Sequence, residues 1–101
     1  MSTIKDVLVE AREIISVPER WTSGANACDA EGNVVDPCSE EATCWCAMGA
    51  MFKAAGKDLN LHDKAALHLY EVTGASIVIV NDRDGREAAL ELLDEAIEVI
   101  G

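Results

Sequence analysis

Apolar residues near the start of the chain recur with the spacing of an amphipathic helix. They lie three or four positions apart, at Ile4, Val7, Leu8, Ala11, Ile14 and Ile15. Charged residues occupy most of the positions between them, so one face is apolar. Thr3 is a suitable cap, with Asp6 three positions on near the positive end of the helix dipole, and Pro18 stops the helix. The pattern predicts a helix that begins after Thr3 and ends before Pro18.

The helical period disappears between residues 21 and 37. This stretch contains residues that favour turns, at Gly24, Asn26, Gly32, Asn33 and Pro37. The tip at residues 29–33 is flanked by two short pairs that suit strands, Ala27–Cys28 and Val34–Val35. We predict a short β-hairpin near residues 26–35, which must pack on helices because two strands alone are barely stable in water.

Residues 36–55 predict a second helix. Asp36 or Ser39 suits its cap, Pro37 suits its first position, and Gly56 ends it. Its apolar residues cover most of the circumference: Ala42, Trp45, Cys46, Gly49 and Phe52 on one face, and Cys44, Met48, Met51 and Ala55 on the other. A helix of this kind belongs in the middle of the fold.

Two further helices are predicted in the C-terminal half. The first covers residues 62–72 and ends at Gly74. The second starts at Asp84 and Glu87, which resemble a capping box, and it carries inward apolar residues at Ala89, Leu90, Leu93, Ala96, Ile97 and Ile100. Between them, residues 76–80 are β-branched, and their short run fits either a strand or a buried helical turn.

These elements define the expected fold class. We predict a mainly α (α+β) protein in which residues 1–101 form a single domain of about four helices with a short β-hairpin. At 101 residues, half of them apolar, the chain can bury a real hydrophobic core.

The chain is strongly acidic, with a formal net charge of −11. Such a charge excludes nucleic acid as a direct ligand, because a DNA-binding surface needs clustered Lys and Arg. A basic protein is the better partner. The last helix directs five carboxylates outward, at Glu87, Glu91, Asp94, Glu95 and Glu98. This acidic face is a candidate partner-binding surface, and a solvated helix face is the alternative interpretation.

No export leader precedes the first helix, and the longest apolar run is too short to cross a bilayer. We therefore expect a soluble protein in the bacterial cytoplasm, with no membrane partner. In that compartment its four cysteines should mostly be reduced thiols. Cys28 and Cys38 flank the predicted hairpin, and whether they pair stays open.

The cysteines do not form a convincing metal site. If Cys44 and Cys46 lie on a helix, they point to nearly opposite sides, since two residues turn the helix by about 200°. We expect both to pack as small buried hydrophobes. His62 and His68 are expected at the surface or its boundary. The sequence thus predicts no metal site, no cofactor and no catalytic residues.

Three blocks of the chain resemble a family of small phage and bacterial proteins that is classed as a domain of unknown function. They are Trp21 to Gly24 followed by the hairpin, Trp45 to Ala50, and Ser76 to Asp82 before the last helix. In that family a tryptophan usually precedes the Asn-Asp pair of the third block, whereas Val80 stands here. The resemblance implies a common fold in which the three blocks pack together, and a phage or prophage origin. It implies no activity, cofactor or catalytic residue.

Two functional hypotheses follow. The first is a non-enzymatic interaction protein that binds a host or defence protein through its acidic surface. The second is a small-molecule or metal-binding domain, because Trp and an Asn-Asp pair are costly choices for a mere turn. Its pocket would form from Trp21, Trp45, Cys46, Gly49, Asn81 and Asp82. A homodimer through the first or last helix stays open as well.

Overall fold

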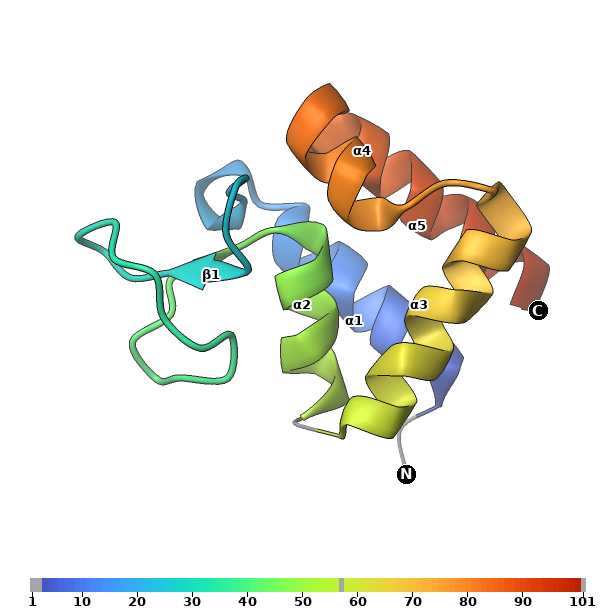
Figure 1. The fold of residues 1–101 in the computed structure, drawn as a ribbon, viewed down its shortest axis with the longest axis horizontal. Helices are drawn as coiled ribbons and strands as arrows, with labels where there is room; N and C mark the ends of the chain where they lie inside the picture. Colours follow the sequence, from blue (N-terminus) through green and yellow to red (C-terminus); the bar gives the residue numbers. More distant parts are fainter. Residues whose placement is uncertain (1–2, 57, 101) are drawn as a thin grey trace.

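The computed structural model describes residues 3–56 and 58–100, which form five α-helices, a 3-10 turn and a two-stranded sheet (Figure 1). In chain order the elements are α1 (Ile4–Ile15), η1 (Pro18–Arg20), β1 (Ala27–Cys28), β2 (Cys44–Trp45), α2 (Ala47–Ala55), α3 (Leu59–Thr73), α4 (Ile77–Asp84) and α5 (Arg86–Ile100). The predicted mainly α fold with a small β element is confirmed.

Helix α1 has the boundaries that its sequence predicts. The Thr3 hydroxyl accepts a hydrogen bond from the backbone N–H of Asp6, and the Asp6 carboxylate accepts one from the N–H of Thr3. This capping box satisfies two N–H groups that the helix itself leaves unpaired. After Ile15 the chain turns into η1, with Pro18 at its start. Local chemistry at both ends therefore determines this helix.

The small sheet pairs β1 with a different strand from the one predicted. Its antiparallel register sets Ala27 opposite Trp45 and Cys28 opposite Cys44. The predicted tip does form, since the N–H of Asp29 donates to the carbonyl of Asn33 at 2.9 Å. Val34, however, makes only an isolated bridge to Cys28. The predicted arms do meet, since the N–H of Val35 donates to the carbonyl of Ala27 at 3.2 Å. They form no continuous strand pair, however, and the second strand of the sheet is Cys44–Trp45 rather than the predicted Val34–Val35.

Helix α2 begins at Ala47, so the prediction of a helix from Asp36 was also wrong. The expected caps are used in tight turns instead. The Asp36 carboxylate accepts from the N–H of Cys38 at 2.8 Å, and the Ser39 hydroxyl accepts from the N–H of Glu41 at 3.1 Å. Bonds to a residue two positions on close turns rather than helices. Cys44 therefore lies in a strand, not on a helix.

The C-terminal half contains one more helix than predicted. Residues 76–80, which were open between strand and helix, belong to α4. Asn81 and Asp82 lie inside this helix and not in a turn. Gly85, with φ of 97°, separates α4 from α5. Asp84 is the last residue of α4, so the predicted capping box with Glu87 was wrong.

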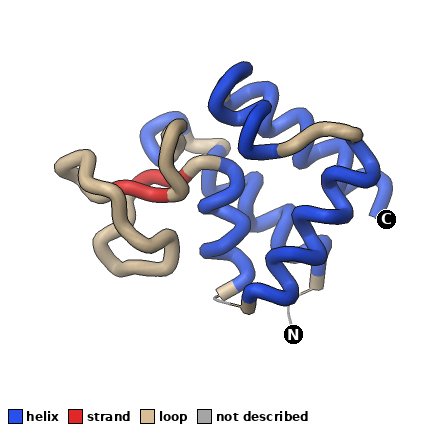
Figure 2. The backbone as a smooth tube through the Cα atoms, in the orientation of Figure 1, coloured by secondary structure: helices blue, strands red, loops and turns tan. Residues whose placement is uncertain are grey.

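The buried apolar side chains form one cluster to which every α-helix contributes. Helix α1 lies at its centre and packs against α2, α3 and α5. Many of the buried positions are alanines: Ala11, Ala27, Ala47, Ala50, Ala54, Ala55, Ala65, Ala89 and Ala96. Small side chains let the helices approach closely. Figure 2 shows the sheet and its loops at one end of the molecule, beside the helices. None of the described helices is long and apolar enough to cross a membrane.

Candidate functional site

Asn81 is the centre of a buried polar junction between α4, the chain after η1 and the start of α2. Its side chain is fully buried. The amide oxygen accepts from the indole N–H of Trp21 at 2.7 Å and from the backbone N–H of Ala47 at 3.0 Å. The amide nitrogen donates to the carbonyl of Thr22 at 3.2 Å and to the Asp82 carboxylate at 3.0 Å. One side chain thus joins three segments that are far apart in the sequence.

The two tryptophans lie on neighbouring segments at this junction. Trp21 forms an isolated parallel bridge with Trp45, and the N–H of Thr22 donates to the carbonyl of Trp45 at 3.0 Å. The indole N–H of Trp45 donates to the carbonyl of Pro37 at 2.9 Å. Each indole therefore has an apolar body in the fold and a paired polar end, as buried tryptophans require.

Gly49 marks the closest approach of α2 to the segment before β1. A Cβ atom at this position would lie 1.7 Å from the carbonyl oxygen of Asn26, so only glycine fits. Next to it, Cys46 caps α2, and its sulfur accepts from the N–H of Gly49 at 3.3 Å. Burial raises the pKa of the Cys46 thiol. The thiol stays protonated at neutral pH, which argues against a nucleophilic role.

The six residues of the predicted pocket therefore come together, and the last of them, Asp82, accepts from the N–H of Gly24 at 3.0 Å. The polar atoms of Trp21, Asn81 and Asp82 are bonded to one another and to the backbone. Among the described residues, no buried side-chain nitrogen or oxygen lacks a partner. The arrangement holds segments together, and a ligand there would compete with existing hydrogen bonds.

A cavity of about 340 Å³ opens elsewhere, between the 36–38 turn and the facing ends of α2 and α3. Its walls are Asn26, Asp36, Pro37, Cys38, Phe52 and Leu59. The sequence did not predict this cavity, because Asp36 to Cys38 was assigned to a helix. The exposure of Leu59, a large apolar side chain that is 62% exposed at the start of α3, is visible only in the structure.

His62 packs against Phe52, one of the walls of this cavity. Its ring stacks on Phe52 with the ring centres 3.7 Å apart and the planes 5° from parallel. It is buried, which corrects the expectation of a surface or boundary histidine. His68 lies at the boundary, where its Nε2 is 3.0 Å from the carbonyl oxygen of Ala96.

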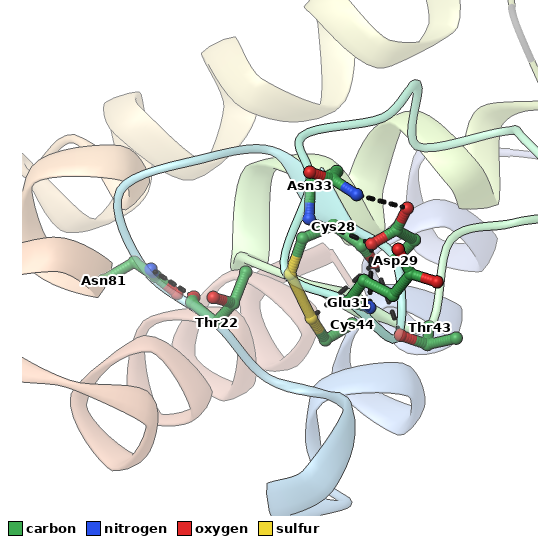
Figure 3. Close-up of a disulfide and its surroundings, with 8 residues drawn as sticks. All are labelled: Thr22, Cys28, Asp29, Glu31, Asn33, Thr43, Cys44 and Asn81. Carbon is green, nitrogen blue, oxygen red and sulfur yellow. Dashed lines mark hydrogen bonds between the residues drawn. A yellow bond between two sulfur atoms is a disulfide. The ribbon is translucent and has the colours of Figure 1, made fainter.

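Cys28 and Cys44 form a disulfide across the two strands (Figure 3). Their Cα atoms are 5.6 Å apart, within the usual range for such a bond. This corrects two expectations: that the cysteines are mostly reduced, and that Cys44 is a buried helical residue. Cys38 is not the partner of Cys28, and its thiol lies 3.7 Å from the carbonyl oxygen of Phe52.

The disulfide closes the loop that carries the hairpin tip. Within that tip the Asp29 carboxylate accepts from the backbone N–H groups of Glu31 and Asn33, each at 2.9 Å (Figure 3). These bonds, that from Asn33 above all, lower the pKa of Asp29. The loop from 29 to 43 is thus ordered by a charged turn at its tip and a covalent bond at its base.

Removing this disulfide is expected to destabilise the protein by about 3 kcal/mol, because the bond restricts a loop of this length in the unfolded chain. The variant Cys28→Ser/Cys44→Ser should show this loss in urea unfolding and should no longer respond to a reductant. Cys38→Ser is the control and should keep the response. Four free thiols in the native, unreduced protein would contradict the assignment.

The five carboxylates of the predicted acidic face are all exposed on α5. One of them, Asp94, is bound by the guanidinium of Arg12 on α1, whose Nε and Nη2 donate to its two carboxylate oxygens. This bond raises the pKa of Arg12. The remaining four, Glu87, Glu91, Glu95 and Glu98, form no ion pair with any described residue.

No group of three or more His, Cys, Asp or Glu side chains among residues 3–56 and 58–100 is arranged to hold a metal ion. The fold and its junction define a small, mainly helical protein with a disulfide-bonded β element at one end. Its sequence matches the model of a family of unknown function, DUF6197, over residues 1–99. The chain belongs to this family, as the resemblance predicted. No curated protein and no solved structure matches it.

Proposed function

We propose that the protein is a non-enzymatic interaction protein that binds a basic partner protein through α5. The observation that carries the proposal is the row of exposed carboxylates on this helix, Glu87, Glu91, Glu95 and Glu98, with no cation bound to them within the described residues. A surface of one charge steers an oppositely charged protein toward it and favours the correct orientation on contact.

The few arginines near this surface are already engaged within the chain. Arg12 binds Asp94, and Arg83 binds Asp84 at 2.9 Å, which lowers the pKa of that carboxyl. Arg86 donates to the carbonyl of Ser16 at 3.0 Å. These cations are therefore not free to neutralise the α5 carboxylates, and the negative field there is left for a partner.

Reversing three of these charges tests the proposal. The variant Glu91→Lys/Glu95→Lys/Glu98→Lys should recover at least about tenfold less partner than the wild type from a bacterial lysate, at about 150 mM salt. Asp94 is left intact because it also holds α1. The matched control reverses Glu19, Glu31 and Glu40 on other exposed surfaces, which changes the net charge equally. Equal loss in both variants, or no partner for the wild type, would contradict the proposal.

A phage or prophage origin, with a host or defence protein as the partner, belongs to the same proposal and rests on the family resemblance. The functions of the neighbouring genes test it. A second copy of this chain, forming a homodimer, is the competing partner for the α5 surface. The acidity of this surface argues against that partner, since two copies would place like charges together. Sedimentation at low and high salt measures the oligomeric state directly.

A cytoplasmic location is the remaining part of the proposal. A disulfide such as Cys28–Cys44 persists mainly in oxidising compartments, so the redox state of these two cysteines in the cell tests this location. Trapping free thiols in intact cells before lysis decides the matter. Four trapped thiols support the cytoplasm, and two support an oxidising compartment.

The alternative site at Trp21, Trp45, Asn81 and Asp82 is tested by native mass spectrometry of the purified protein. A bound ion or small molecule that is lost in Asn81→Ala would favour it. A bare mass supports the interaction protein.

A further inference from the structure

We propose that the cavity between the 36–38 turn and the ends of α2 and α3 binds a small organic cation, an ammonium group on an apolar body about the size of one aromatic ring. Its volume of about 340 Å³ lies at the lower end of the range for small-molecule sites, roughly 300–1,000 Å³. This proposal does not rest on the acidic face of α5, which belongs to a different part of the fold.

The walls of the cavity are held in place by contacts with one another and with residues outside it. The carbonyl of Pro37 accepts from the Trp45 indole, and the Asp36 carboxylate is bonded to the N–H of Cys38. Phe52 is stacked on His62. The cavity therefore exists without a ligand, and a pre-formed site loses little conformational entropy on binding.

The backbone of Asn26 is fixed in the same way. Its carbonyl accepts from the N–H of Cys46 at 3.2 Å and faces Gly49 so closely that no side chain fits between them. Leu59 opens α3, whose N-cap Asp58 accepts from the N–H of Leu61. Rigid elements therefore carry these two walls as well.

The chemistry of the walls selects the ligand. Pro37, Phe52 and Leu59 supply apolar contacts, and the face or edge of Phe52 not covered by His62 is available to a ligand. Asp36 supplies the one formal charge among the six residues, and its Oδ2 accepts no hydrogen bond from any described residue. A carboxylate beside an aromatic ring favours a cation. The net charge of −11 acts in the same direction and repels anions.

The exposure of Leu59 supports a site at this place. Leu59 is 62% exposed and lies outside the buried core cluster, so its side chain is free to cover a ligand in the neighbouring cavity. The exposed side chains of Asn26 and Asp36 line the same opening, so a ligand can enter from solvent.

The test is an NMR titration of the purified protein with benzyltrimethylammonium, compared with benzyl alcohol and phenylacetate. The cation should shift the backbone signals of Asn26, Cys38 and Leu59 in a saturable manner, and the neutral and anionic probes should bind at least about tenfold more weakly. Absence of a saturable shift at about 10 mM cation, near the weak limit of specific ligands, would overturn the proposal.

Two substitutions assign the binding to the cavity without disturbing the core. Asp36→Asn keeps an oxygen that can accept from Cys38 and removes the charge, so the cation should bind about tenfold more weakly. Leu59→Ser removes an apolar wall that the core does not use and should weaken binding about fivefold.

The matched control is Glu40→Gln, which removes one charge from the same loop outside the cavity and should leave affinity within about twofold. Equal weakening by Asp36→Asn and Glu40→Gln would mean that the cation senses only the general negative field, and the proposal would fail. Unchanged spectra for the rest of the protein show that each variant is folded.

Discussion

Replacing Gly49 by alanine is expected to destabilise the protein by about 4 kcal/mol or more, a large part of the roughly 5–15 kcal/mol that stabilises a typical domain. The new Cβ would lie 1.7 Å from the carbonyl oxygen of Asn26 and 2.6 Å from its carbonyl carbon. Both are backbone atoms, and the carbonyl also accepts from the N–H of Cys46, so the segment cannot move aside without losing that bond. Urea unfolding followed by tryptophan fluorescence measures the loss.

Helix propensity makes the opposite prediction for the same substitution. Alanine is preferred over glycine inside a helix by about 1 kcal/mol, so a free α2 would be stabilised. The sign of the measured change therefore decides between the two effects. Gly24→Ala is the control: nothing lies within 4 Å of its Cβ position, and its φ of 81° alone costs about 1–2 kcal/mol. A Gly49→Ala protein as stable as the wild type would refute the close approach.

Replacing Asn81 by alanine is expected to cost about 4 kcal/mol. The substitution removes the partner of the buried N–H of Ala47, and of the indole N–H of Trp21 and the carbonyl of Thr22, which are half-buried. Each buried polar group without a partner costs about 1–3 kcal/mol. The loss should appear in urea unfolding, together with a change in the native fluorescence of Trp21.

Two further variants separate hydrogen bonding from other effects of the Asn81 substitution. Asn81→Asp keeps the acceptor oxygen but removes the donor and sets a second carboxylate beside Asp82, so it should be about as unstable near neutral pH. Asn60→Ala, at an exposed position of α3, should change stability by less than about 0.5 kcal/mol. If Asn81→Ala costs no more than Asn60→Ala, the junction does not hold the segments together.

One part of the site was predicted from the sequence: the meeting of Trp21, Trp45, Gly49 and Asn81. Large indoles, a glycine in an apolar run and a polar residue after a β-branched run are unusual choices, and each marks a contact with another segment. What those contacts are could not be read from the chain. The polar atoms pair with one another, and this pairing depends on how three distant segments meet.

The sequence predicted neither the disulfide nor the cavity, for a single reason. Apolar residues from 42 to 55 continue a helical pattern, and the turn chemistry of Asp36 and Ser39 resembles helix caps. In the fold these side chains accept hydrogen bonds from the N–H two positions on, so helix α2 begins only after its N-cap, Cys46. Cys44 then lies in a strand opposite Cys28, and the 36–38 turn becomes a cavity wall.

The sequence by itself determined the long helices α1, α3 and α5 and the charge of the protein. Their apolar period extends over several turns, and most of their end signals act within a few residues. Only the tertiary structure decided the helical state of residues 77–84, the strand that pairs with β1, the partner of Cys28 and the position of the cavity. Each of these depends on contacts between segments whose local preferences are short or divided, so packing, and not propensity, selects among them.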